Sequence, residues 1–225
     1  MTDRTLEAYI DGLADDLEPV RRLWSPWVRA AAWLAVVTGA AAVLARFSDL
    51  HDLAYRLLYV PDMWLAVLGS TLTMVLGALA TFQLSLPDRS TRWALLPLPG
   101  LALWVAGTGM GCLRTWVIPE THSASLQEAH DCFVFIVGLS VPLSLVTVLM
   151  VRRALPFRPN LVAGVGGLAI SAAAATLLNF LHPYDAGATD FAVHIVAISF
   201  VIAVNRVVGG RLLGKAAAVR RRSAA

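Results

Sequence analysis

The chain has 225 residues, of which 58% are hydrophobic and only 15% are charged. Soluble domains carry roughly 25% charged residues, and a mean hydropathy of +0.69 over the whole chain is too high for a water-soluble fold. Two cysteines are too few for a disulfide-rich scaffold or a four-thiolate metal site. The composition therefore indicates an integral membrane protein with no room for a second globular domain.

The first predicted element is a short acidic helix, which is unlike a basic, apolar signal peptide. Apolar residues at three- and four-residue spacing form one stripe along about four helical turns: Leu6, Tyr9 or Ile10, Leu13 and Leu17. Pro19 ends this helix. Its net charge is −5, from Asp3, Glu7, Asp11, Asp15, Asp16 and Glu18 against Arg4. Because acidic headgroups repel such a helix, we expect it either to fill a partner's groove or to fold onto the chain's own inner loops.

Six apolar runs follow, each close to the ~20 residues that a membrane-spanning helix needs. We expect them at about Trp27–Arg46, Met63–Leu86, Trp93–Leu113, Cys132–Val151, Asn160–Leu181 and Phe191–Val208. Short connections predict antiparallel neighbours. The predicted fold is an all-α polytopic membrane protein: a cytoplasmic amphipathic segment (1–26), a six-helix transmembrane domain with short loops (27–208) and a basic cytoplasmic tail (209–225).

The distribution of basic residues predicts the orientation of these spans. With the N-terminus inside, the inner segments hold fourteen: Arg4, Arg21, Arg22, Arg29, Arg89, Arg92, Arg152, Arg153, Arg158, Arg211, Lys215, Arg220, Arg221 and Arg222. The outer side then holds three, namely Arg46, Arg56 and Arg114. The positive-inside rule therefore places both termini in the cytoplasm.

The middles of the spans contain no ionisable residue, although substrate or proton pathways usually need them. The polar residues Gln83, Asn179 and Asn205 are expected to make hydrogen bonds between helices. Small residues recur every four positions, which favours close packing of helix backbones. The stripes are Gly69, Thr73 and Gly77 in the second span, Gly107 and Gly111 in the third, and Ala163, Gly167, Ser171 and Ala175 in the fifth.

The predicted outer side gathers the residues with reactive chemistry. It holds both cysteines, Cys112 and Cys132, and all five histidines, His51, His122, His130, His182 and His194. Soft metals select thiolate and imidazole ligands, so Cys132 and His130 are candidate ligands for a soft metal ion. Asp190 and His194, four residues apart, share one side of a helix. These residues either sense a signal or are ordinary loop and packing residues, because their spacing matches no recognised zinc pattern.

Several short motifs resemble the NrsF-like family of six-span inner-membrane anti-sigma factors. They are LADDLEPVRRL at 13–23, LPDRS at 86–90, RWALLP at 92–97, GCLR at 111–114, DCF at 131–133, and Leu181-His182-Pro183 before His194. The resemblance extends over essentially the whole chain. One departure is Pro183, since family members commonly place a cysteine beside the histidine that corresponds to His182.

The resemblance implies an anti-sigma factor of the bacterial inner membrane. It would sequester an extracytoplasmic-function sigma factor through Leu6, Ile10, Leu13, Asp15, Asp16, Leu17, Pro19, Arg21 and Arg22. An envelope, oxidative or heavy-metal signal would act at Cys112, Cys132, His130, His182, Asp190 and His194. We expect no enzymatic activity, no resident cofactor beyond a transient soft metal ion, and no direct contact with nucleic acid. The sequence does not decide whether the protein forms a homo-oligomer. The alternatives are a small transporter or channel, which the apolar mid-spans disfavour, and a thiol-redox membrane protein, which lacks a CxxC motif.

Overall fold

The computed structural model describes residues 7–8, 11–12, 22–117, 126–181 and 188–215. Within these ranges the chain is helical and has no strand. The α-helices are α2 (Pro26–Leu44), α3 (Leu50–Tyr59), α4 (Pro61–Leu84), α5 (Leu98–Val117), α6 (Leu126–Val151), α7 (Pro159–Leu178) and α8 (Ala188–Val204). Two 3₁₀ helices, η1 (Thr91–Leu95) and η2 (Arg152–Ala154), precede α5 and follow α6, and a π-helical turn, η3 (Asn205–Gly209), continues α8.

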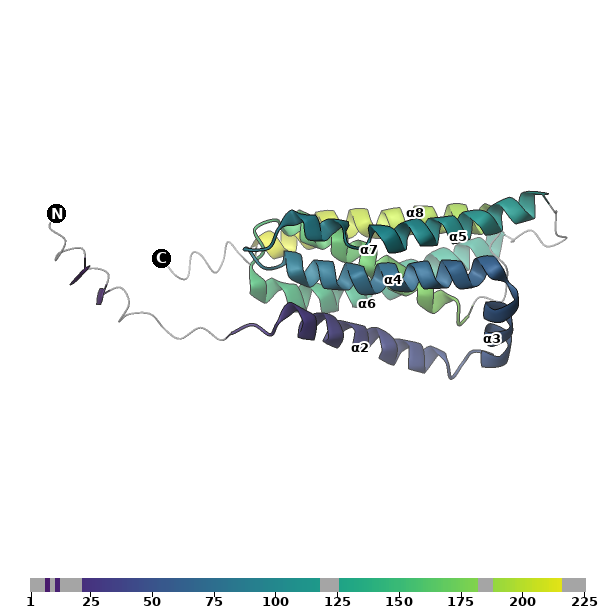
Figure 1. Cartoon of the computed structure of the whole chain (residues 1–225), viewed down its shortest axis with the longest axis horizontal. Helices are drawn as coiled ribbons and strands as arrows, with labels where there is room; N and C mark the ends of the chain where they lie inside the picture. The colour runs from purple at the N-terminus through teal and green to yellow at the C-terminus, as the bar shows by residue number, and fades with distance from the viewer. Residues whose placement is uncertain (1–6, 9–10, 13–21, 118–125, 182–187, 216–225) are drawn as a thin grey trace.

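Six of these helical segments are long and apolar enough to cross a membrane, which confirms the predicted all-α fold with six spans. They run lengthwise beside one another in an elongated bundle, with α2 at one edge (Figure 1). The central helix is α7, because it packs against α4, α6 and α8 and nearly its whole length is buried. The alanine-rich sequence of α7 makes this burial possible, since small side chains let three neighbours approach one axis.

Glycines place α4 directly against α5. A Cβ atom added at Gly100 would lie 2.6 Å from the backbone nitrogen of Thr73, and one at Gly107 would lie 2.5 Å from that of Ala66. A Cβ at Gly69 would overlap the backbone of Trp104. The small-residue stripes therefore act in helix packing, as predicted, and the helices could not approach this closely with larger residues.

One helix was not predicted. The loop after the first span forms α3, and Asp49 caps it by accepting bonds from the backbone nitrogens of His51 and Asp52. Arg56 and Asp52 form an ion pair of 2.9 Å one turn apart. The cap, the acidic first turn and the basic last turn are local signals that could have identified this helix.

The expected hydrogen bonds between helices are made by other residues. The amides of Asn179 and Asn205 donate to carbonyls of their own helical segments, at Ala175 and Val201, so this prediction was wrong for both. An interhelical bond instead joins the hydroxyl of Thr176 in α7 to that of Ser70 in α4, at 2.9 Å. The short side chain of a polar residue reaches the backbone carbonyl one turn earlier in its own helix more easily than it reaches a neighbouring helix.

Candidate functional site

The two ends of the bundle differ in chemistry. At the arginine end, α2 begins, α4 and α6 end, and the connections 85–97 and 152–158 carry Arg89, Arg92, Arg152, Arg153 and Arg158. At the opposite cysteine end lie Cys112 in α5 and Cys132 in α6. The beginning of α2 and the two cysteines therefore belong to opposite ends of the bundle (Figure 1).

Most of the predicted sigma-binding residues lie outside the described part of the chain. These are Leu6, Ile10, Leu13, Asp15, Asp16, Leu17, Pro19 and Arg21. Arg22 is described and exposed, just before α2. Within the predicted helix, Glu7, Ala8, Asp11 and Gly12 are helical and exposed. The roles of these residues in binding remain predictions.

Arg29 attaches the first turn of α2 to two other helices at the arginine end. Its side chain is 4% exposed. Nη1 donates to the hydroxyl of Ser85 at 3.1 Å, immediately after α4, and Nη2 donates to the carbonyl of Met150 at 2.7 Å, in the last turn of α6. The guanidinium carbon also lies 4.9 Å from the centre of the Phe82 ring. These contacts, which we call the Arg29 clamp, use the planar fork of N–H donors that lysine lacks.

Trp33 continues this attachment one turn further along α2. The indole is 1% exposed, and its Nε1–H donates to the hydroxyl of Thr147 in α6 at 2.9 Å. Val37, another turn along, is also buried. Positions 29, 33 and 37 lie on one face, so α2 contacts the bundle through a single stripe while most of its other residues are exposed.

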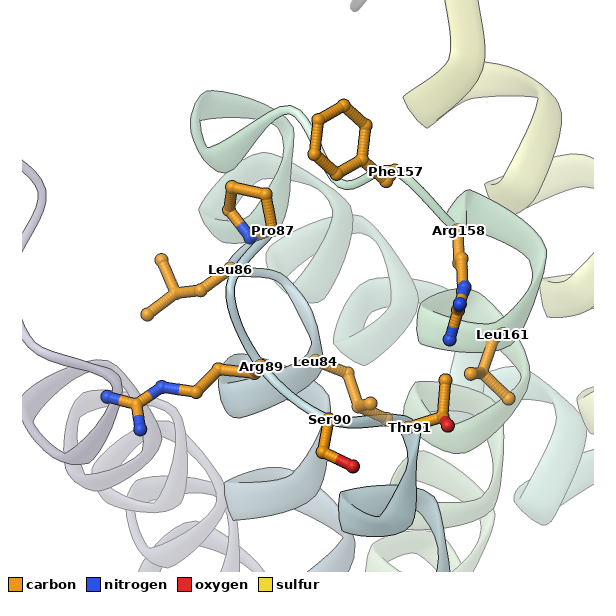
Figure 2. A pocket seen from close by; sticks show the side chains of 9 residues that line it. All are labelled: Leu84, Leu86, Pro87, Arg89, Ser90, Thr91, Phe157, Arg158 and Leu161. Carbon is orange, nitrogen blue, oxygen red and sulfur yellow. The ribbon is translucent and has the colours of Figure 1, made fainter.

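A pocket of about 290 Å³ opens at the arginine end (Figure 2). One wall comes from the end of α4 and the connection that follows, with Leu84, Leu86, Pro87, Arg89, Ser90 and Thr91. The other wall is formed by Phe157, Arg158 and Leu161 at the start of α7. Arg158 points toward Thr91, whereas Arg89 extends away from the pocket, toward the ribbon of the chain's beginning. Phe157 is 68% exposed and forms an apolar part of the rim. The two arginines, Arg89 and Arg158, add positive charge to the lining.

At the cysteine end, Cys132 is a buried packing residue. It is 3% exposed and clusters with Ile136 of α6, Ala174 and Leu178 of α7, and Ala197 of α8. His130, two residues earlier, is exposed, and its Nδ1 lies 3.3 Å from a carboxylate oxygen of Asp131. The structure thus places the two candidate metal ligands on different faces of α6.

Three of the other predicted sensing residues, Cys112, Asp190 and His194, lie at the same end of the molecule. Cys112 is partly buried on α5, which packs mainly against α4. His194 is partly buried one turn after Asp190 in α8, whereas His182 lies outside the described residues. Over the described residues, no group of three or more histidine, cysteine or acidic side chains is arranged to hold a metal ion. The sensing roles and the soft-metal site therefore remain predictions.

The Arg29 clamp and the pocket were missed because both join segments that are distant in the chain. Arg29 lies 56 residues from Ser85 and 121 from Met150. The available signal was an arginine inside the first apolar helix, which the sequence analysis counted only as an orientation marker.

A model of the protein family described as "NrsF: Negative regulator of sigma F" matches residues 13–214 of the chain. No curated protein and no solved structure was found to be similar to it.

Proposed function

Because the chain belongs to the NrsF family, and is thereby a negative regulator of a sigma factor, we propose that it holds an extracytoplasmic-function sigma factor at the bacterial inner membrane. The observation that carries this proposal is the range of the match. It begins at residue 13, inside the acidic amphipathic segment, and continues through all six apolar helices. The segment and the bundle therefore belong to one regulatory unit.

In this proposal the arginine end faces the cytoplasm, where a sigma factor is found. The support is the excess of basic residues on that side, fourteen against three, because cytoplasmic loops are enriched in lysine and arginine. An even number of spans then places both termini in the cytoplasm.

The sigma-binding segment is residues 1–23, with Leu6, Ile10, Leu13 and Leu17 in a groove of the sigma factor and Asp15 and Asp16 facing basic residues. Fully burying one leucine contributes about 1.5–3 kcal/mol. The double change Leu13→Ala, Leu17→Ala should therefore weaken binding at least about tenfold, since ~1.4 kcal/mol is a factor of ten. It should also cause constitutive expression of the sigma regulon while the protein remains in the membrane. Normal repression by a chain lacking residues 1–20 would contradict this assignment.

The inducing signal, oxidative stress or a soft metal, acts in this proposal at the cysteine end. Arg114 lies two residues from Cys112 in the sequence, and a nearby positive charge favours the reactive thiolate. A shift of α6 would reach α2 through the Met150 carbonyl that Arg29 holds. Moving the equilibrium from 1:99 to 99:1 needs about 5.5 kcal/mol, which a disulfide or a multi-ligand metal site could supply.

The test of this step is the double variant Cys112→Ser, Cys132→Ser. It should repress the sigma regulon normally and lose induction by oxidants and soft metals. Full release of the sigma factor from this variant under the inducing condition would make the cysteines packing residues only. We further propose that the chain has no enzymatic activity and does not contact nucleic acid directly.

A further inference from the structure

The pocket at the arginine end lies in a strongly basic surface. The connections 85–97 and 152–158, which supply most of its lining, contain five arginines and one acidic residue, Asp88, for a net charge of +4. This net charge includes Asp88, whose 71% exposed carboxylate forms an ion pair of 3.8 Å with Arg89 Nε; such exposed pairs are weak. An acidic ligand is therefore the occupant that these residues favour.

The open rim and the lining of the pocket favour a peptide side chain over a small-molecule ligand. Pockets for small molecules enclose most of the ligand, whereas this one, of about 290 Å³, is open at its rim. Phe157 and Pro87 are exposed at its lining, next to Leu161 and the largely buried Leu84, whereas Arg89, Ser90, Thr91 and Arg158 make the larger part of its surface polar. Such a pocket can receive one or two aliphatic side chains of a segment that lies across it.

The Arg29 clamp attaches the beginning of α2 close to the connection that forms one wall of this pocket. Ser85, which accepts a bond from Arg29, is followed directly by the lining residue Leu86. Met150, which accepts the other bond, precedes the connection that carries Phe157 and Arg158. The beginning of α2 is therefore attached beside Ser85, directly before the first wall of the pocket, and Arg89 extends toward this part of the chain in Figure 2.

The segment that precedes α2 has the matching chemistry. Residues 1–19 have a net charge of −5 and an apolar stripe that includes Leu13 and Leu17. Only four residues separate Leu17 from Arg22, the first residue described without a break up to α2. An extended chain covers roughly 3.3–3.6 Å per residue, so about 17 Å of reach is available between these two residues.

We propose that this pocket docks the chain's own acidic N-terminal segment, with Leu17 inserted between Leu84, Phe157 and Leu161 and with Asp15 and Asp16 facing Arg89 and Arg158. The inference rests on the proposed function, because the same apolar stripe is assigned there to the sigma factor. Docking and sigma binding then exclude each other.

Such a site would act as an intramolecular competitor of the sigma factor. A tethered segment is present at an effective concentration of millimolar order, so weak contacts are enough to populate the docked state. The apparent affinity for the sigma factor falls in proportion to the undocked fraction. A signal that strengthens docking would thus release the sigma factor without any change in the sigma-binding residues.

The experiment is site-specific photocrosslinking of the full-length protein in membranes. Phe157 is replaced by benzoylphenylalanine, and crosslinked peptides are mapped by mass spectrometry. We expect intramolecular crosslinks to residues 10–20. The matched control places the same probe at Phe47, which is 78% exposed at the cysteine end and should give no such crosslink. Crosslinks from position 157 only to lipid, to another protein or to a second copy would overturn the proposal.

Charge reversal separates specific docking from chance proximity. Arg89→Glu with Arg158→Glu should lower the crosslink yield about five- to tenfold, because attraction becomes repulsion at two exposed pairs. Adding Asp15→Arg and Asp16→Arg should restore it, and an unchanged yield in the first variant would reject the docking geometry. The two proposals fail separately. If the crosslink is absent while deletion of residues 1–20 still derepresses the regulon, docking alone is wrong. If the crosslink forms, but the protein lacking residues 1–20 still represses the regulon, sigma binding by the segment is wrong.

Discussion

The Arg29 clamp leads to a quantitative prediction about how α2 is held. Replacing Arg29 by methionine keeps the aliphatic length of the side chain and removes the bonds to Ser85 and Met150. Hydrogen bonds to charged groups contribute about 1.5–3 kcal/mol each in soluble proteins, whereas bonds between membrane helices average ~0.6 kcal/mol. Two bonds therefore contribute between about 1 and 6 kcal/mol. The charge of the donor and its 4% exposure favour the middle of this range, so we expect a loss of ~3 kcal/mol.

The assay is unfolding of the purified protein in mixed micelles of a mild detergent and sodium dodecyl sulfate. Arg153→Met is the matched control, because it removes an exposed arginine from the same end and should change the unfolding free energy by less than ~0.5 kcal/mol. Trp33→Phe, which removes one neutral bond to Thr147 and part of a ring, should lie between them at about 1 kcal/mol.

Arg29→Lys tests the geometry of the clamp separately from its charge. An ammonium group lacks the planar fork that reaches Ser85 and Met150 together, so this variant should lose most of the same stability. If Arg29→Met unfolds no more easily than Arg153→Met, the clamp contributes nothing to stability. If lysine preserves full stability, the positive charge rather than the two-bond geometry holds α2.

Three further predictions follow from the packing and the charge distribution. Gly69→Ala should destabilise the bundle by about 1–3 kcal/mol or more, because the added methyl overlaps the backbone of Trp104, while Gly109→Ala, with open space around it, should unfold at the same detergent fraction as the parent or a higher one. Cys112 should react with a maleimide before Cys132, which is 3% exposed, and equal rates in the folded protein would contradict the burial of Cys132. Reporter fusions after Asp52, Glu120 and Gly187 should be active in the periplasm, and cytoplasmic activity at any of the three would reject the proposed orientation.

The sequence by itself determined the number and approximate positions of the spans. Each span depends on a local property, the run of apolar residues, and a helix in lipid satisfies its own backbone hydrogen bonds without help from distant residues. The match of the family model over residues 13–214 likewise agrees with the motifs read from the chain. The small-residue stripes predicted close packing correctly, because periodicity identifies the face of a helix, although it does not identify the neighbour.

The tertiary structure alone decided which residues meet. The Arg29 clamp joins positions 56 and 121 residues apart, and the pocket is formed by two connections that no local pattern relates. Tertiary packing also gave different environments to residues that are close in the sequence. His130 and Cys132 are two positions apart, so they lie about 200° from each other around the axis of α6. The packing of α6 buries the face that carries Cys132 and leaves His130 exposed. A helical sequence specifies the order of side chains around each axis, whereas the rotation of one helix against another depends on the packing of the whole bundle.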